Sequence, residues 1–254
     1  MGTMSPEGYR RAGVARPGAL LALFVGVLAP LLVFGFLAED VWTREGFAWD
    51  LPLLRAVHAW STPPLDTTML FFTRVGAPLP LIAFVALALL ALLLRGRRGA
   101  ALFFALAVGG AAGLNVVAKL VFQRARPALW PSLVTETDYS FPSGHALGSL
   151  AVVAALVFLT WRTRGRWPTL ALGALFAAAV GLSRVYLGVH YPSDILAGWC
   201  ASLAWVAGVW LLLRAAPWSR WRTRTAGNDG ARWPHARIVA NGAERSTAAR
   251  GVGR

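Results

Sequence analysis

The chain has 254 residues, of which 57% are hydrophobic and only 14% are charged. Its mean hydropathy of +0.56 excludes an ordinary soluble domain, and the apolar residues come in long runs. The net charge of +14 would suit a nucleic-acid-binding protein, but the arginines fall in short clusters between the apolar runs rather than along one face. We therefore expect a membrane protein with no nucleic-acid partner.

Six apolar runs are each predicted to form a membrane-spanning helix. The first, residues 19–38, is longer than the apolar core of about 7–15 residues in a signal peptide, and no clear small-x-small site follows it. We therefore expect a retained helix rather than a cleaved signal peptide. The other runs cover residues 77–94, 100–122, 146–161, 169–183 and 195–213. The sequence thus predicts an all-α polytopic membrane protein, with six transmembrane helices in one bundle over residues 19–213.

The segments outside these runs are polar or amphipathic. Leu51, Leu54, Val57 and His58 recur at helical spacing, which indicates a short helix on the membrane surface. His58 has no charged partner motif beside it, and we interpret it as an interfacial side chain rather than a catalytic one. Residues 1–18 are predicted to be a short cytoplasmic segment. Residues 214–254 are predicted to be a basic, disordered cytoplasmic tail that touches anionic membrane lipids.

The distribution of arginine predicts the orientation in the plasma membrane. Because basic clusters mark cytoplasmic segments, six crossings with both termini in the cytoplasm account for all of them. The connections after the first, third and fifth crossings then lie on the extracytoplasmic face. The clusters between the crossings are Arg95, Arg97 and Arg98, and Arg162, Arg164 and Arg166, while Arg10, Arg11 and Arg16 precede the first crossing.

The first of three polar patches on that outer face is a pair of cations. Lys119 is the only lysine among the 25 basic side chains, which marks it as a candidate for a chemical role, with chance as the alternative. Lys119 and Arg126 are seven residues apart, so they would share one face if the helix continued. Pro127 ends the segment there. Two cations on one face repel each other unless an anion joins them, so the pair indicates an anion site.

The other two patches each contain a histidine. Ser143 and Gly144 open the fourth run, where backbone N–H groups and the helix dipole favour an anion, and His145 follows as a candidate proton donor. Taken alone, Ser143 fits a helix N-cap better than a phosphate ligand. Arg184 and His190 lie between the fifth and sixth runs. Asp194, four residues after His190, can hold one imidazole nitrogen and leave the other as a lone pair.

Together the patches predict phosphoryl transfer through a phosphohistidine. In this hypothesis His190 attacks phosphorus, Asp194 orients His190, and His145 protonates the leaving oxygen and then activates water. Five residues hold the phosphate oxygens: Lys119, Arg126, Ser143, Gly144 and Arg184. No acidic cluster suited to Mg²⁺ adjoins the motifs, so we expect no metal and no cofactor.

The motifs Lys119-x6-Arg126-Pro127, Pro142-Ser143-Gly144-His145 and Ser183-Arg184-x5-His190-x3-Asp194 resemble the three signatures of the type 2 phosphatidic acid phosphatase superfamily. They match in residue type, order and spacing. The resemblance implies six helices, an active site near the outer membrane surface and a lipid phosphate substrate. The superfamily also contains soluble vanadate-dependent haloperoxidases, but six apolar runs argue against that branch.

The favoured substrate is undecaprenyl diphosphate, with phosphatidic acid or phosphatidylglycerol phosphate as the alternative. A different class of function is a membrane protein that binds or transports phospholipid headgroups without catalysis. His145 and His190 argue against that class, since binding alone requires neither.

Overall fold

The computed structural model describes residues 17–215, and this part of the chain is helical, with no strand. The predicted terminal segments, residues 1–18 and 214–254, lie almost wholly outside the described residues. The helices are α1 (Pro17–Leu23), the π-helical turn η1 (Phe24–Leu28), α2 (Ala29–Thr43), α3 (Asp50–His58), α4 (Pro63–Val75), α5 (Pro78–Leu94), α6 (Arg98–Phe122), α7 (Gly144–Thr160), α8 (Arg166–Tyr186) and α9 (Pro192–Ala215).

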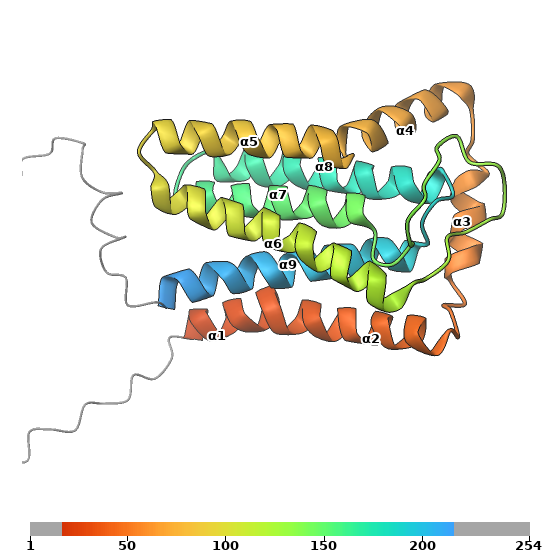
Figure 1. Cartoon of the computed structure of the whole chain (residues 1–254), viewed down its shortest axis with the longest axis horizontal. Coiled ribbons are helices and arrows are strands. Elements are labelled where there is room, and N and C mark those ends of the chain that lie inside the picture. The colour runs from red at the N-terminus through yellow and green to blue at the C-terminus, as the bar shows by residue number, and fades with distance from the viewer. Residues whose placement is uncertain (1–16, 216–254) are drawn as a thin grey trace, which may run out of the picture. The chain divides into compact units, whose positions relative to one another are not determined.

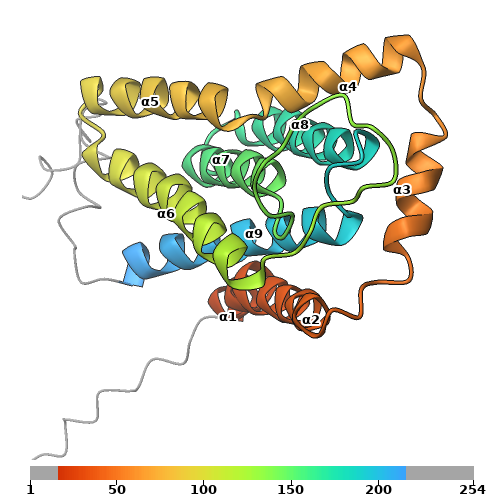
Figure 2. The same ribbon diagram turned by 45° about the vertical axis from the view of Figure 1, so that its right-hand side comes forward.

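The long helices lie side by side, and the short helix α3 lies across one end of them (Figure 1). At that end are the α6–α7 connection and the α8–α9 turn (Figure 2), and the predicted reactive residues lie in these two connections and in the helix ends that flank them. The α5–α6 and α7–α8 turns, with their arginine clusters, lie at the opposite end. The fold therefore separates the basic turns from the predicted site.

Within the described residues, four helical segments are long and apolar enough to cross a membrane: residues 24–43, α6, α8 and α9. The number is five if α4 and α5, which bend by 48° at their junction, count as one span. The prediction of an all-α, multi-pass membrane protein is confirmed, whereas the count of six stays a prediction. The remaining apolar helix, α7, has 17 residues. It is about 26 Å long at 1.5 Å per residue, slightly less than a hydrocarbon core of about 30 Å.

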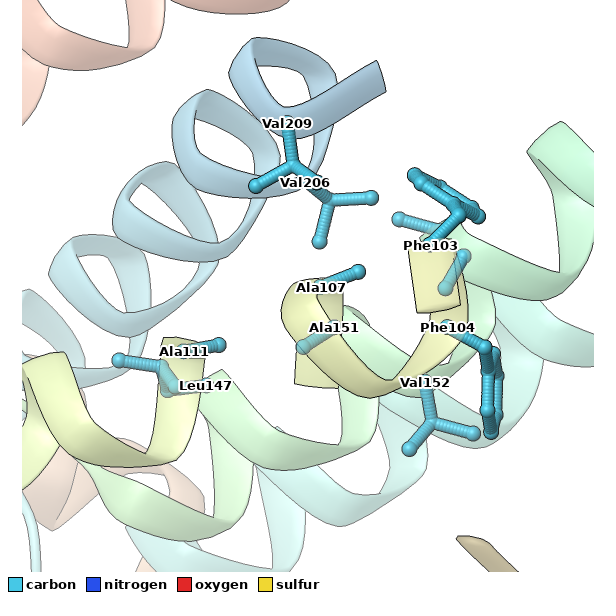
Figure 3. Close-up of a cluster of buried hydrophobic side chains, with 11 residues drawn as sticks. Phe103, Phe104, Ala107, Ala111, Leu147, Ala151, Val152, Val206 and Val209 are labelled. Carbon is cyan, nitrogen blue, oxygen red and sulfur yellow. The ribbon is translucent and has the colours of Figure 1, made fainter. Parts of the chain in front are cut away.

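The bundle packs around α7. Phe103, Phe104, Ala107 and Ala111 of α6 meet Leu147, Ala151 and Val152 of α7 and Val206 and Val209 of α9 (Figure 3). Alanine at the contact positions lets the helix backbones approach closely. This close van der Waals packing stabilises the bundle in lipid, where the hydrophobic effect does not drive helices together. A helix covered by its neighbours in this way needs less lipid-facing length, which accounts for the short α7.

The outward faces of the bundle are apolar. Leu79 and Leu94 of α5, Leu172 of α8 and Leu212 of α9 are each at least 69% exposed, as expected for surfaces that contact lipid chains. Exposed tryptophans lie near both ends of the bundle. Trp42 and Trp60 flank α3 in the sequence, and Trp161 and Trp167 lie at the α7–α8 turn. Tryptophan favours the two membrane–water interfaces, so the bundle has the surface of a membrane protein.

Two details concern the ends of helices. The first helical segment continues through Glu39 and Asp40 to Thr43, past the predicted end at residue 38, because a helix can extend beyond the apolar run into the interface. Helix α6 ends at Phe122, since Gln123 has the left-handed conformation (φ 44°). The helix does not continue to Arg126, so Lys119 and Arg126 do not share a helical face.

Candidate active site

Lys119 and Arg126 still converge, although by another route. Lys119 lies in the last turn of α6, and Arg126 reaches it from the α6–α7 connection. Both side chains form ion pairs with Asp138 of the same connection, and Lys119 also donates to the carbonyl of Tyr139 at 2.8 Å. The chain reversal after Gln123 thus brings the two cations together around one carboxylate.

His190 and Asp194 form the buried centre of the site, with 1% and 0% of their surface exposed. The Arg126 Nη1 lies 3.0 Å from Nε2 of His190. Because arginine only donates hydrogen bonds, Nε2 accepts and the ring carries its proton on Nδ1. That nitrogen lies 3.4 Å from Oδ2 of Asp194 and 3.3 Å from Oγ of Ser140. The arrangement leaves the Nε2 lone pair facing the cations.

Burial is the largest influence on the protonation of His190. Desolvation lowers the pKa of His190 from 6.5 to about 4; Asp194 opposes this shift, while Arg184 and Arg126 add to it. The imidazole is therefore neutral at pH 7, the form that a nucleophile requires.

Ser143, Gly144 and His145 begin α7 beside this centre. Ser143 Oγ caps the helix by accepting from the Ala146 N–H at 3.5 Å, and the Ser143 N–H donates to the carbonyl of Asp194 at 3.1 Å. The Ser143 N–H is therefore occupied, contrary to its expected role as an open anion donor. Arg184, Lys119 and Arg126 act electrostatically on His145, the second residue of α7.

Gly144 lies in a tight position at the start of α7. A Cβ on Gly144 would lie 3.0 Å from Oδ1 of Asn115, and Asn115 in turn donates to the carbonyl of Pro142 at 3.0 Å. The N–H groups in the first turn of a helix lack helical acceptors. The glycine therefore lets the start of α7 lie close to Asn115 of α6.

Arg184 is 1% exposed and is held by groups from two other segments. It donates to the hydroxyl of Thr73 in α4 and pairs with Glu136 of the α6–α7 connection. Its Nε is buried without a hydrogen-bond partner among the described residues. A buried N–H without an acceptor is costly, so this position favours a further anionic ligand.

Glu136 and Asp138 occupy the space among the cations. Glu136 pairs with Arg184 and lies 3.6 Å from Arg126, and Asp138 pairs with Lys119 and Arg126. The sequence did not assign these two carboxylates to the site, and they reach it because the connection folds back over the motifs. Desolvation would raise the pKa of Asp138, but its hydrogen bonds and charge interactions with Lys119 and Arg126 lower it to about 2.

No group of three or more His, Cys, Asp or Glu side chains is arranged to hold a metal ion within residues 17–215. Each of the two added carboxylates is instead neutralised by basic side chains. Independence of metal stays a prediction for experiment.

Sequence reasoning missed Asp50, Arg124 and Ser140, which are hydrogen-bonded around Asp194. Arg124 bridges Asp194 and Asp50, and Ser140 Oγ donates to Oδ2 of Asp194 at 2.5 Å. Asp50 is 2% exposed at the start of α3. The position of Asp50 at the start of an amphipathic segment is a weak sequence signal that it contributes to the site. The spacing of Arg124, two residues before Arg126, is another.

Comparison with known proteins identifies the family. Residues 98–218 match the PAP2 superfamily. Undecaprenyl-diphosphatase BcrC of Bacillus subtilis is 35% identical over 57% of this chain and 74% of its own length. Phosphatidylglycerophosphatase B of the same species is 29% identical over 68% of this chain and 87% of its length.

The fold agrees with this similarity. The crystal structure of a transmembrane PAP2-type phosphatidylglycerolphosphate phosphatase from Bacillus subtilis superposes with a TM-score of 0.65 at 28% identity, covering 74% of this chain and 93% of that one. The three motifs, the helical membrane bundle and these relatives agree, and the chain belongs to the PAP2 superfamily of membrane lipid phosphatases.

Proposed function

We propose that this phosphatase hydrolyses undecaprenyl diphosphate through a phosphohistidine formed on His190. The observation that carries the proposal is the orientation of the imidazole. Its Nδ1 faces Asp194, and its Nε2 faces Arg126 at 3.0 Å. A neutral histidine held in this tautomer presents a lone pair to whatever anion the cations bind.

The phosphate binds among Lys119, Arg126 and Arg184. The unpartnered Nε of Arg184 and the first-turn N–H of Gly144 add donors, and the Ser143 hydroxyl lies beside them. Because Glu136 and Asp138 pair with these same cations, the substrate exchanges with the two carboxylates as it enters. Fixed cations then stabilise the charge that develops on the non-bridging oxygens.

Two displacements complete the reaction. The Nε2 of His190 forms a bond to phosphorus as the bond to the leaving oxygen breaks, and His145 gives that oxygen a proton. A water molecule then gives its proton to His145 and attacks phosphorus, which breaks the N–P bond and releases phosphate. Asp194 accepts from Nδ1 throughout and stabilises the positive charge on the ring.

The relatives favour two substrates. One is named an undecaprenyl-diphosphatase and another a phosphatidylglycerophosphatase, so phosphatidylglycerol phosphate is the second candidate. The higher identity, 35% against 29%, favours undecaprenyl diphosphate. Both lipids combine a chain that stays in the bilayer with a phosphate at the interface, where Trp42 and Trp60 border this end of the bundle.

We further propose six crossings with the site on the extracytoplasmic face and both termini in the cytoplasm. The arginine-rich turns lie at the end opposite the site (Figure 1), and the positive-inside rule assigns such turns to the cytoplasm. Residues 17–43 and the helices α5 to α9 supply the six crossings.

The test is a substrate panel with a nucleophile variant. Purified wild-type protein and His190→Ala are assayed for phosphate release from undecaprenyl diphosphate, phosphatidylglycerol phosphate and phosphatidic acid in the same detergent. We expect the highest kcat/KM with undecaprenyl diphosphate, and a loss of at least about 10³-fold in His190→Ala. Wild-type turnover by His190→Ala would refute the nucleophile. A higher kcat/KM with phosphatidylglycerol phosphate would assign the second candidate instead.

A further inference from the structure

Arg124 lies behind the catalytic pair, on the side of Asp194 away from His190. Its Nη1 lies 2.6 Å from Oδ1 of Asp194 and 2.7 Å from Oγ of Ser193. Its Nη2 lies 2.9 Å from Oδ2 of Asp50. The guanidinium carbon also stacks 4.0 Å from the ring centre of Tyr191. Arg124 is thus fixed on several sides, and none of these contacts involves the phosphate pocket.

The two oxygens of Asp194 have separate partners. Oδ2 accepts from Ser140 Oγ at 2.5 Å and from the Tyr191 N–H at 2.9 Å, and it is the oxygen that faces His190. Oδ1 accepts from Arg124. A carboxylate held at both oxygens cannot rotate, so Arg124 determines which oxygen meets the imidazole.

Asp50 balances the charge of Arg124. A lone cation against Asp194 would draw negative charge away from His190 and weaken the stabilisation of its protonated form. Asp50 is 2% exposed, pairs with Arg124, and accepts from both the N–H and the hydroxyl of Ser193 at 2.9 and 2.5 Å. The buried group of two aspartates and one arginine therefore keeps a net negative charge beside the imidazole.

We propose that Arg124 and Asp50 are positioning residues for the reaction: Arg124 fixes the carboxylate of Asp194 against His190, and Asp50 holds and neutralises Arg124. Because Asp50 opens α3, hydrogen bonds of this carboxylate link the interfacial helix to the catalytic centre. The inference rests on the proposed function, since it assigns roles relative to His190 as the nucleophile.

The test compares Arg124→Gln, Asp50→Asn and the double variant with wild type, using one lipid substrate so that the ionisation of the substrate is common to all. Arg55→Gln, an exposed arginine on α3, is the matched control for loss of a positive charge. We expect Arg124→Gln to lower kcat by roughly 10–100-fold with KM changed less than about threefold. The double variant loses less than the product of the two single losses, because removing one cation and one anion together keeps the net charge that the wild-type group has.

The pH profile separates positioning from a structural role. The groups that face His190 are Asp194, Arg126, Arg184 and His145, and all remain in these variants. Removing Arg124 leaves more negative charge near the imidazole, so the acidic limb of kcat/KM moves to higher pH. Asp50→Asn leaves an uncompensated cation and moves it to lower pH. A residue that only stabilises the fold would not give opposite shifts.

Arg124→Lys is a second variant for the case in which Arg124→Gln does not fold. It keeps the positive charge but loses the two nitrogens with which the guanidinium bridges Asp194 and Asp50. We expect a lower kcat with the acidic limb at its wild-type position. An active wild type with kcat unchanged in Arg124→Gln or Arg124→Lys, or shifts of the same sign in the two single variants, would overturn this inference alone. An inactive wild type would overturn the proposed function instead.

Discussion

Asp138→Asn tests whether a carboxylate of the protein competes with phosphate for the cations. The pKa of Asp138 falls from 3.8 to about 2 against the opposing effect of desolvation, which corresponds to about 2.4 kcal/mol of favourable interaction. The side chain is 54% exposed, so solvent screening reduces this to about 1 kcal/mol. An anion that displaces Asp138 loses that amount, a factor of about five in affinity.

The assay is inhibition by orthovanadate, a phosphate analogue that adopts the five-coordinate geometry of the transition state. We expect the inhibition constant of Asp138→Asn to be about fivefold lower than that of the wild type. Glu45→Gln, an exposed carboxylate in the α2–α3 connection, is the matched control for loss of a negative charge and should leave the constant unchanged. An unchanged or higher constant in Asp138→Asn would show that Asp138 does not oppose the anion.

Three further outcomes follow from the site and its packing. Since the pKa of His190 is about 4, roughly 90% of its imidazole is neutral at pH 5, against about 3% for an ordinary histidine. We therefore expect kcat/KM to persist at pH 5 and to fall as the pH passes through 4. A fall of kcat/KM near pH 6.5 would contradict His190 as the buried nucleophile. Incubation with EDTA should leave turnover unchanged, whereas loss restored by Mg²⁺ would refute metal independence. Gly198→Ala should lower the free energy of unfolding by about 1–3 kcal/mol, because the new Cβ would lie 2.9 Å from the carbonyl oxygen of Ser143. Gly208→Ala is the control, since a Cβ there would have no atom within 4 Å.

Local sequence patterns predicted most of the helices. The apolar runs predicted α5 to α9 closely, and the spacing of Leu51, Leu54 and His58 predicted α3. What these patterns could not give was the path of the chain after α6, since Gln123 adopts a left-handed conformation that no strong sequence signal marks. The number of membrane crossings also depends on packing, because α7 has only 17 residues and is covered by neighbouring helices.

The site was predictable where residues act within one motif and not where they meet across the fold. His190 and Asp194 are four residues apart, one in the α8–α9 connection and the other in the first turn of α9, so their pairing is local in the sequence. Asp50 and Arg124 are 74 residues apart, and nothing in either segment specifies the other. Glu136 and Asp138 lie in a connection without regular structure, so only the folded chain shows that they pair with the cations.

The most direct test of the account is to trap the covalent intermediate. Wild type and His145→Ala, in which hydrolysis of the intermediate should be slowed, are mixed with a lipid substrate labelled at the transferred phosphate and quenched in alkali during a single turnover. The account predicts protein-bound, acid-labile phosphate that mass spectrometry assigns to His190. Phosphate on another residue, or a completed turnover with no protein-bound phosphate at any time in either protein, would contradict it.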